Sequence, residues 1–197
     1  AFDYLIKPVR HVEVLHRLSQ IGAMSELRAE NKALRKAIGE SRPLYRFTSS
    51  AMSKVERLVD KIALTDNTVL VTGESGTGKE VLARFVHARS TRSKRPFITV
   101  NCAAIPENLL ESELFGHEKG SFTGALARRI GKFEEANGGT LLLDEVSEME
   151  VRLQAKLLRA IQERVIDRVG GNRPVPVDIR IIATSNRNLT DAVREGK

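Results

Sequence analysis

A glycine-rich stretch with one lysine is the clearest chemical motif of the chain. It fits the P-loop pattern GxxxxGK and lies between an apolar segment and a segment of helical periodicity. Backbone N–H groups of such a loop can surround phosphates, and the lysine can neutralise the β- and γ-phosphates. Glu follows the lysine where Ser or Thr is usual, so the hydroxyl ligand of Mg²⁺ is missing. The candidate nucleotide-binding residues are Gly73, Glu74, Ser75, Gly76, Thr77, Gly78, Lys79 and Glu80.

Two acids at the end of an apolar segment form a second candidate site. Residues 140–145 read TLLLDE, and they follow the P-loop in the chain. If this segment is a strand of a parallel sheet, Asp144 and Glu145 lie at its carboxyl edge, beside the P-loop. Asp144 would then hold Mg²⁺ through water, and Glu145 would polarise the attacking water. Alone such a pattern is often only a strand end, but the P-loop makes it indicate ATP hydrolysis.

Two asparagines also come at the ends of predicted strands. Asn186 follows residues 178–185 and could hydrogen-bond the γ-phosphate or its water. Asn101 ends residues 97–101 and could hold Glu145 in an inactive pose. An asparagine at a strand exit is more often a turn or a cap, so for Asn186 both interpretations stay open.

A loop around Phe122 has no nucleotide role that its residue types explain. Glycines flank the aromatic residue inside the polar stretch 117–125. Such a side chain either packs on its own domain or faces a partner. The residue types alone favour the packed position.

These motifs need a sheet to bring them together. Short apolar segments at 68–72, 97–101, 140–145 and 178–185 alternate with segments of helical periodicity. This alternation predicts an α/β fold, with a parallel sheet covered by helices on both faces. The carboxyl ends of the strands would carry the P-loop, the acid pair and both asparagines.

The N-terminal part has a different pattern. Residues 1–8 predict a buried strand, and residues 9–41 predict one long helix with a heptad seam. A polar residue in such a seam often fixes a two-stranded parallel coiled coil, so we favour a dimer linker. The alternative is a helix packed on its own domain. The seam consists of Met24, Leu27, Asn31, Leu34 and Ile38.

Composition and charge argue against several classes of protein. The chain has 197 residues and 41% hydrophobic content, which is enough for a packed core. No apolar run approaches the roughly 18 residues of a membrane-spanning helix. One cysteine and four scattered histidines show no disulfide or metal-site spacing, which fits a reducing cytoplasm. The net charge of +7 is not concentrated in one block, so we expect no direct DNA binding and no membrane contact.

Several longer stretches resemble one known family. ESELFGHEKGSFTGA is similar to the stretch that holds the GAFTGA signature of sigma-54-dependent activators, the NtrC-like AAA+ proteins. GESGTGKE, VNCAAIPENLLESELFG, GGTLLLDE and RVGGNRPVPVDIRIIATSNRNL resemble the same family in the same order. The resemblance covers about residues 44–197. It implies a three-layer P-loop AAA+ core with a parallel sheet, preceded by a helical linker.

The resemblance also implies roles for the candidate residues, with ATP and Mg²⁺ as cofactors. Asn186 would be the first sensor and Asn101 the partner that restrains Glu145. Glu80 is usual in the family, which removes the objection to Mg²⁺. Residues 168–177 would form a second surface loop. The loop that contacts sigma-54 would be Gly120, Ser121, Phe122, Thr123, Gly124 and Ala125, with Ser121 in place of the commoner Ala.

The resemblance finally implies a domain order. AFDYLIKP resembles the last strand of a response-regulator receiver, so residues 1–20 would be a receiver tail, 21–43 a helical linker and 44–197 a truncated AAA+ ATPase core. The expected function is ATP-dependent remodelling of sigma-54 RNA polymerase in a two-component system. Subunits would dimerise and then form a hexameric ring.

DNA contact and the arginine fingers would belong to later parts of the intact protein. This chain alone would therefore bind ATP with little turnover. A non-catalytic nucleotide-binding assembly module, or another AAA+ machine, is the alternative function.

Overall fold

The computed structural model describes residues 49–187, 189 and 194. The expected receiver tail, the long helix and its heptad seam lie outside the described residues. The bounds of the three expected segments therefore stay predictions. Within the described part, no helix is long and apolar enough to cross a membrane.

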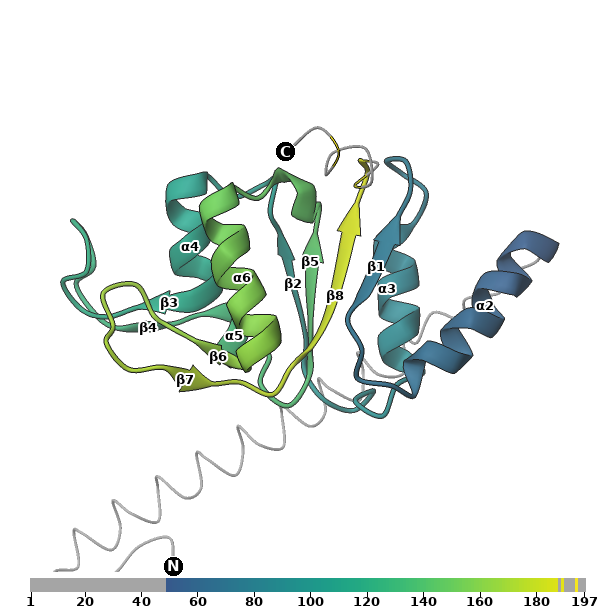
Figure 1. Cartoon of the computed structure of the whole chain (residues 1–197), viewed down its shortest axis with the longest axis horizontal. Helices are drawn as coiled ribbons and strands as arrows, with labels where there is room; N and C mark the ends of the chain where they lie inside the picture. The colour runs from purple at the N-terminus through teal and green to yellow at the C-terminus, as the bar shows by residue number, and fades with distance from the viewer. Residues whose placement is uncertain (1–48, 188, 190–193, 195–197) are drawn as a thin grey trace, which may run out of the picture. The chain divides into compact units, whose positions relative to one another are not determined.

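Four parallel strands form the central sheet. They are β1 (Val69–Thr72), β2 (Phe97–Asn101), β5 (Thr140–Asp144) and β8 (Arg180–Ser185). Their order across the sheet is β1-β8-β5-β2, which Figure 1 shows from right to left. The two central strands are the most buried, and Leu141, Leu142 and Leu143 have no exposed surface. Burial on both faces explains why these segments read as continuous apolar runs rather than alternating ones. The predicted α/β fold with a parallel sheet is confirmed.

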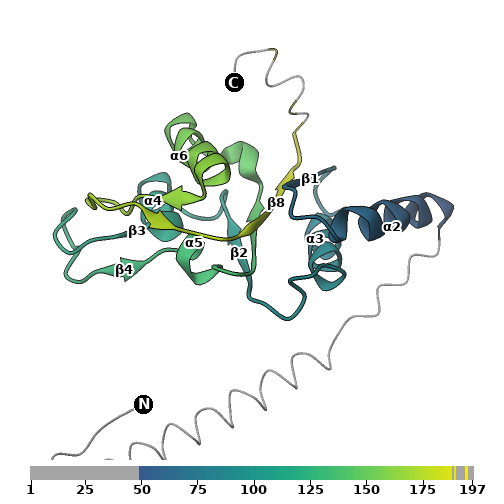
Figure 2. The ribbon, with the colours of Figure 1, turned by 60° about the horizontal axis from the view of Figure 1, so that its bottom comes forward.

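Helices cover both faces of this sheet. Figures 1 and 2 together show α3 (Lys79–Ala88) on one face and α6 (Val151–Glu163) on the other. The inner face of α6 buries Leu153, Leu157 and Ala160 in the core. The remaining helices are α4 (Glu107–Phe115), α5 (Lys132–Glu135), the short 3₁₀ helix η1 (Val146–Glu148) and α2 (Ser50–Ala63), which packs on α3.

Local chemistry sets the ends of α2. Ser49 caps its N-terminus by accepting the N–H of Met52 at 3.2 Å. At the other end, the buried guanidinium of Arg180 donates to the carbonyls of Ile62 and Ala63 at 2.8 and 2.9 Å. This one side chain ties the last turn of α2 to the start of β8.

Two small antiparallel hairpins project from one side of the core (Figure 1). One pairs β3 (Gly116–His117) with β4 (Arg129–Ile130), and the other pairs β6 (Val165–Ile166) with β7 (Val175–Pro176). The sequence predicted only loops here, at residues 117–125 and 168–177. Two-residue strands carry no readable periodicity, so these hairpin strands were missed.

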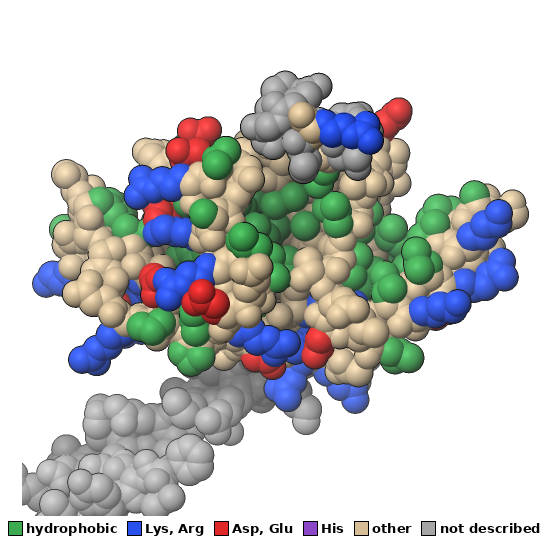
Figure 3. Space-filling view, in the orientation of Figure 1, with side chains coloured by type: hydrophobic (Ala, Val, Ile, Leu, Met, Phe, Trp, Pro, Cys, Tyr) green, Lys and Arg blue, Asp and Glu red, His purple; other side chains and the backbone are tan. Residues whose placement is uncertain are grey.

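The surface over α6 carries charges of both signs, as Figure 3 shows on one face. Lys156 pairs with Glu111 at 2.5 Å, and Arg159 pairs with Glu163 at 2.9 Å. Such pairs neutralise one another locally. The expectation of no direct DNA binding by this chain is not tested by this pattern and stays a prediction.

Candidate nucleotide site and projecting loop

The P-loop runs from the end of β1 to the start of α3. Gly76 and Gly78 adopt left-handed backbone angles, with φ of 78° and 88°, which a side chain would oppose. Thr77 Oγ1 donates to the carbonyl of Glu74 at 2.8 Å and closes the turn. Residues 74–78 are exposed while Lys79 is buried, so the loop presents its backbone to solvent around one buried cation.

The acid pair sits at the carboxyl end of β5, as predicted. Asp144 is the last residue of β5, and Glu145 follows with a left-handed backbone, φ 52°. Left-handed backbone at a residue other than glycine is uncommon and often marks a functional site. The turn sends Glu145 away from β2 and toward the end of β8.

Glu145 contacts the P-loop directly. Its Oε1 lies 3.3 Å from Lys79 Nζ, and the two side chains are only 16% and 8% exposed. Its Oε2 accepts the backbone N–H of Asn186 at 3.0 Å. Lys79 Nζ also donates to the carbonyls of Gly73 and Glu74 at 3.0 and 3.1 Å. The structure thus brings Lys79, Glu145 and the backbone of Asn186 together.

The expected contact of Asn101 differs from the one observed. Its side-chain amide donates to Asp144 Oδ2 at 3.2 Å, rather than restraining Glu145. The cause is the strand register, which pairs Asn101 with Asp144 across β2 and β5. Its Oδ1 accepts the N–H groups of Ala103 and Ala104, so it also caps the turn after β2. In this structure Asn101 therefore positions the first acid of the pair.

Thr184 is a member of the site that the sequence did not reveal. Its hydroxyl donates to Asp144 Oδ1 at 2.6 Å and accepts the N–H of Glu145 at 2.9 Å. It is fully buried in β8. This one hydroxyl holds both acids, because β8 lies next to β5. Only the strand order could have pointed to it.

Glu80 is the predicted site residue whose side chain turns away. Its Oε1 accepts two bonds from Arg84, at 2.7 and 3.0 Å, on the exposed side of α3. An ion pair between residues i and i+4 of one helix explains this orientation. What Glu80 can offer a phosphate is its backbone N–H in the first turn of α3.

The donor set suits a magnesium ion that is bound mainly by water and phosphate. Among the described residues, no cluster of three or more histidine, cysteine or acidic side chains could hold a metal alone. Mg²⁺ is commonly held by one or two carboxylates together with phosphates and water. Asp144 at the edge of the P-loop offers such a carboxylate.

Cys102 lies beside this site but is chemically quiet. Burial, with a smaller effect of nearby Asp144, raises the pKa of its thiol to about 12. Its backbone N–H donates to the carbonyl of Asp144 at 2.9 Å. A neutral, buried thiol is a poor nucleophile, so Cys102 supports the turn after β2 without a part in the chemistry.

The loop carrying Phe122 joins β3 to β4. It is closed by hydrogen bonds from the N–H of Gly120 to the carbonyl of Ala125 at 2.8 Å, and from the N–H of Ala125 to Phe122 at 3.0 Å. Phe122 is 41% exposed, Thr123 and Gly124 are exposed, and Ala125 is buried. The two expectations for Phe122 each describe part of its environment. One side of its ring packs against His117, and the rest is exposed.

The second surface loop is tied to the first. His117 forms a parallel bridge with Val169, and Arg168 donates to Glu118 at 2.9 Å. Arg168 also binds Glu134 through two nitrogens, at 2.5 and 2.8 Å. Hydrogen bonds to these carboxylates raise the pKa of Arg168 further above its ordinary value. Residues predicted as two separate loops therefore form one unit.

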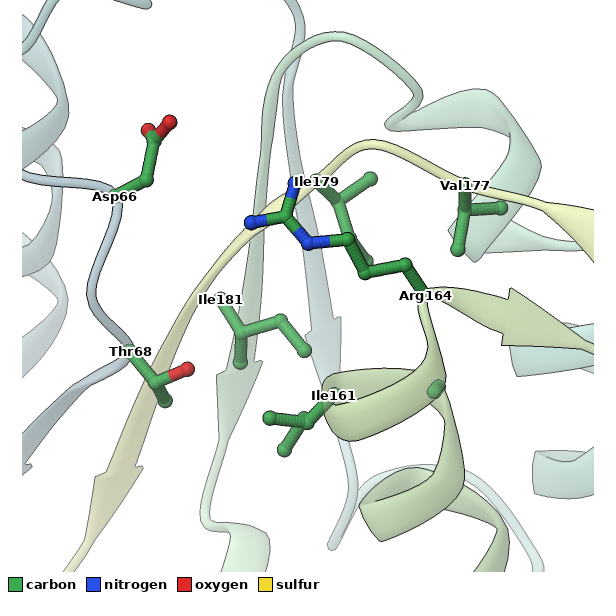
Figure 4. A pocket seen from close by; sticks show the side chains of 8 residues that line it. Asp66, Thr68, Ile161, Arg164, Val177, Ile179 and Ile181 are labelled. Carbon is green, nitrogen blue, oxygen red and sulfur yellow. The ribbon is translucent and has the colours of Figure 1, made fainter.

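A hollow lies at the end of the central sheet away from the P-loop (Figure 4). It opens at the amino ends of β1 and β8, whereas the P-loop follows the carboxyl end of β1. Apolar side chains line it together with the polar Asp66, Thr68 and Arg164, and its place at the amino ends of the strands separates it from the phosphate site. The lining residues are Asp66, Thr68, Ala160, Ile161, Arg164, Val177, Ile179 and Ile181.

Comparison with known proteins places this chain in a family. The family model of the sigma-54 interaction domain matches residues 45–197. Transcriptional regulatory protein FlbD of Caulobacter vibrioides is 73% identical over 146 residues, covering 74% of this chain and 32% of FlbD. Regulatory protein AtoC of Escherichia coli is 52% identical over 198 residues, covering 100% of this chain and 43% of AtoC.

A solved structure agrees with these matches. NtrX from Brucella abortus, crystallised in complex with ATP, superposes with a TM-score of 0.77 at 36% identity. The match covers 100% of this chain and 41% of the NtrX chain. This chain spans less than half the length of each of these relatives. The family match over residues 45–197 is decisive, and the chain belongs to the sigma-54 interaction domain family.

Proposed function

We propose that this chain is the ATP-binding core of a sigma-54-dependent transcriptional activator that works in a two-component system. In the intact protein, ATP hydrolysis drives remodelling of RNA polymerase that carries sigma-54. The observation that carries the proposal is the contact of Lys79 with Glu145 at 3.3 Å, at the strand edge that also holds Asp144. The family match and the ATP complex of the related NtrX support the choice of nucleotide.

Each residue of the site has a part in this mechanism. The exposed backbone of residues 74–78 surrounds the phosphates, and Lys79 neutralises the β- and γ-phosphates. Asp144 would hold Mg²⁺ through water, and the bound ion would neutralise charge on the phosphates. Glu145, whose Oε1 lies 3.3 Å from Lys79 Nζ, orients and polarises the attacking water. The side chain of Asn186 senses the γ-phosphate, because its backbone already contacts Glu145.

Asn101 would serve two positions of the site. In this structure it holds Asp144 by a hydrogen bond of 3.2 Å. When Lys79 turns to phosphate, Glu145 loses this partner, and it would then swing back toward β2, where the Asn101 amide would exchange Asp144 for Glu145. This exchange would link nucleotide state to the position of the acid pair.

The output surface is the loop of residues 120–125. Phe122 at its tip contacts sigma-54, with Thr123 beside it. The second loop, residues 168–177, supports the first through the contacts of Arg168 with Glu118 and of Val169 with His117. The intact protein would work as a dimer that assembles into a hexameric ring in the cytoplasm. Residues 1–20 would end a receiver domain, residues 21–43 would link it to the ATPase core, and DNA would be bound by a further domain.

Capture of sigma-54 tests this proposal. The intact protein is mixed with sigma-54 in the presence of ADP and aluminium fluoride, and the complex is measured by gel filtration. Phe122→Ala should lose the complex while it keeps ATP turnover, and Thr123→Ala should behave similarly. An exposed aromatic anchor commonly contributes about 2 kcal/mol or more to binding. Undiminished capture by Phe122→Ala would contradict the proposed output surface.

A further inference from the structure

The covered side of the Phe122 ring faces a single buried histidine. The rings of Phe122 and His117 lie 5.0 Å apart between centroids at an angle of 68°, an edge-to-face arrangement. His117 is 9% exposed, and its Nδ1 lies 2.7 Å from the hydroxyl of Ser112. Ser112 is itself buried in α4. A chain of three side chains thus runs from a core helix to the tip of the loop.

The two inner members of this chain are firmly placed. His117 lies in β3, where it pairs with Arg129 of β4 and bridges to Val169. Gly116, just before it, sits so close to the facing strand that an added Cβ would lie 2.6 Å from the carbonyl of Arg129. The backbone of His117 is therefore fixed on both sides. The bond to Ser112 then fixes the orientation of its ring.

The loop itself is held mainly by short-range bonds. Ser121 Oγ donates to the carbonyl of Glu118 at 2.8 Å, and the N–H of Gly120 donates to Ala125 at 2.8 Å. Bonds of this kind keep the loop compact but would move with it as a unit. The ring contact with His117 instead connects Phe122 to the hairpin stem.

We propose that Ser112 and His117 form a latch that holds Phe122 against the β3–β4 hairpin, in a resting position. His117 is a positioning residue, since it contacts Phe122 and lies outside the candidate nucleotide site. Aromatic pairs of this geometry can shift a two-position equilibrium by roughly two- to twelve-fold. Such a latch is weak enough to be released when the loop moves. Its consequence for sigma-54 rests on the function proposed above.

A single tryptophan can measure the latch without any partner. The chain contains no tryptophan, so Phe122→Trp in the 197-residue chain introduces one reporter at the loop tip. Acrylamide quenching of its fluorescence reports how exposed position 122 is. Adding Ser112→Ala should raise the quenching constant by about twofold or more, in line with the strength of an aromatic pair. Ser112→Thr keeps a hydroxyl and should restore the original value.

A matched control lies in the same loop. Leu126 is 86% exposed, so Leu126→Trp reports on a position that the latch does not cover. Its quenching should not change when Ser112→Ala is added. His117→Leu provides a second route, with the melting temperature measured to exclude a fold defect. Unchanged quenching at position 122 in both Ser112→Ala and a folded His117→Leu would overturn the latch.

Sigma-54 capture by the intact protein tests whether the latch affects the proposed function. Ser112→Ala should raise sigma-54 capture with ADP alone by roughly two- to twelve-fold, while ATP turnover stays as in the unmodified protein. Suppose that Ser112→Ala increases the exposure of residue 122, but that neither Ser112→Ala nor Phe122→Ala changes sigma-54 capture. This result would support the latch and contradict the proposed function. Suppose instead that Phe122→Ala loses sigma-54 capture, but that Ser112→Ala leaves the exposure of residue 122 unchanged. This result would support the proposed function and overturn the latch.

Discussion

Lys79 and Glu145 neutralise one another across the P-loop, with 3.3 Å between Nζ and Oε1. The same lysine donates to two carbonyls of its own loop. In the proposed site, a nucleotide would therefore compete with Glu145 for the Lys79 ammonium group. If Lys79 binds phosphate as proposed, binding of a nucleotide and release of Glu145 are coupled by this ion pair.

Substitutions at the two ends of this pair should have opposite effects on affinity. Lys79→Ala should abolish ATP binding, because the phosphates lose their main cation. Glu145→Gln should abolish turnover but raise ADP affinity by roughly fivefold, since a partly exposed ion pair is worth about 1 kcal/mol. ADP titration by calorimetry avoids the trapping of ATP that lost hydrolysis alone would cause. Equal ATP affinity in wild type and Lys79→Ala would rule out the site.

Thr184→Val should lower both the stability of the domain and the rate of ATP hydrolysis. The methyl group replaces a hydroxyl that binds both Asp144 and the N–H of Glu145. Loss of these buried hydrogen bonds should lower the free energy of unfolding by about 1–3 kcal/mol. It should also lower kcat in the intact protein, with little change in nucleotide affinity.

Thr140→Val is the matched control for that substitution. Thr140 is equally buried, but it lies at the other end of the sheet, where its hydroxyl contacts His87 Nδ1 at 2.9 Å. Its loss should reduce stability and leave kcat per folded protein unchanged. Equal losses of kcat in both variants would remove Thr184 from the catalytic group.

The 197-residue chain should bind ATP and hydrolyse it only slowly. Among the described residues, Lys79 is the one cation with an ion pair to the acid pair at the P-loop. A further arginine on the phosphates can be worth about 10³–10⁵ in rate in comparable enzymes. Phosphate release by the purified chain should therefore be far slower than by the intact protein. Comparable turnover in the two would show that the described residues suffice.

His87 should make the domain less stable in mild acid. Burial, followed by the charges of Arg180 and Arg84, lowers the pKa of His87 to about 4 from an ordinary value of 6.5. Between these two values the unfolded chain takes up a proton that the folded chain refuses. Stability should therefore fall as the pH drops from about 6.5 toward about 4, by roughly 1 kcal/mol between pH 7 and pH 5.5.

Urea unfolding of the chain at several pH values would measure this effect. His87→Gln removes the titrating group and keeps an amide that can bond to Thr140. In that variant the slope between pH 6.5 and 5.5 should flatten. The same slope in both proteins would mean that other groups cause the acid sensitivity.

Much of the nucleotide site could be predicted from local sequence. The spacing of glycines around Lys79 requires a tight turn before a helix, and the backbone angles of Gly76 and Gly78 agree. The apolar run of residues 140–143 required a buried strand, so the acids after it had to reach a sheet edge. These features follow from the chain's own geometry, since short-range sterics and burial act within a few residues.

Only the tertiary structure decided which side chains meet. Thr184 reaches both acids because β8 lies between β1 and β5, and Asn101 binds Asp144 because of the register of β2. The latch on Phe122 likewise needs α4, β3 and the loop to meet in space. Strand order, register and the pairing of two-residue strands depend on contacts between distant segments. The hydrophobic periodicity of a segment does not specify its partner, because a buried strand has the same apolar pattern whichever strand lies beside it.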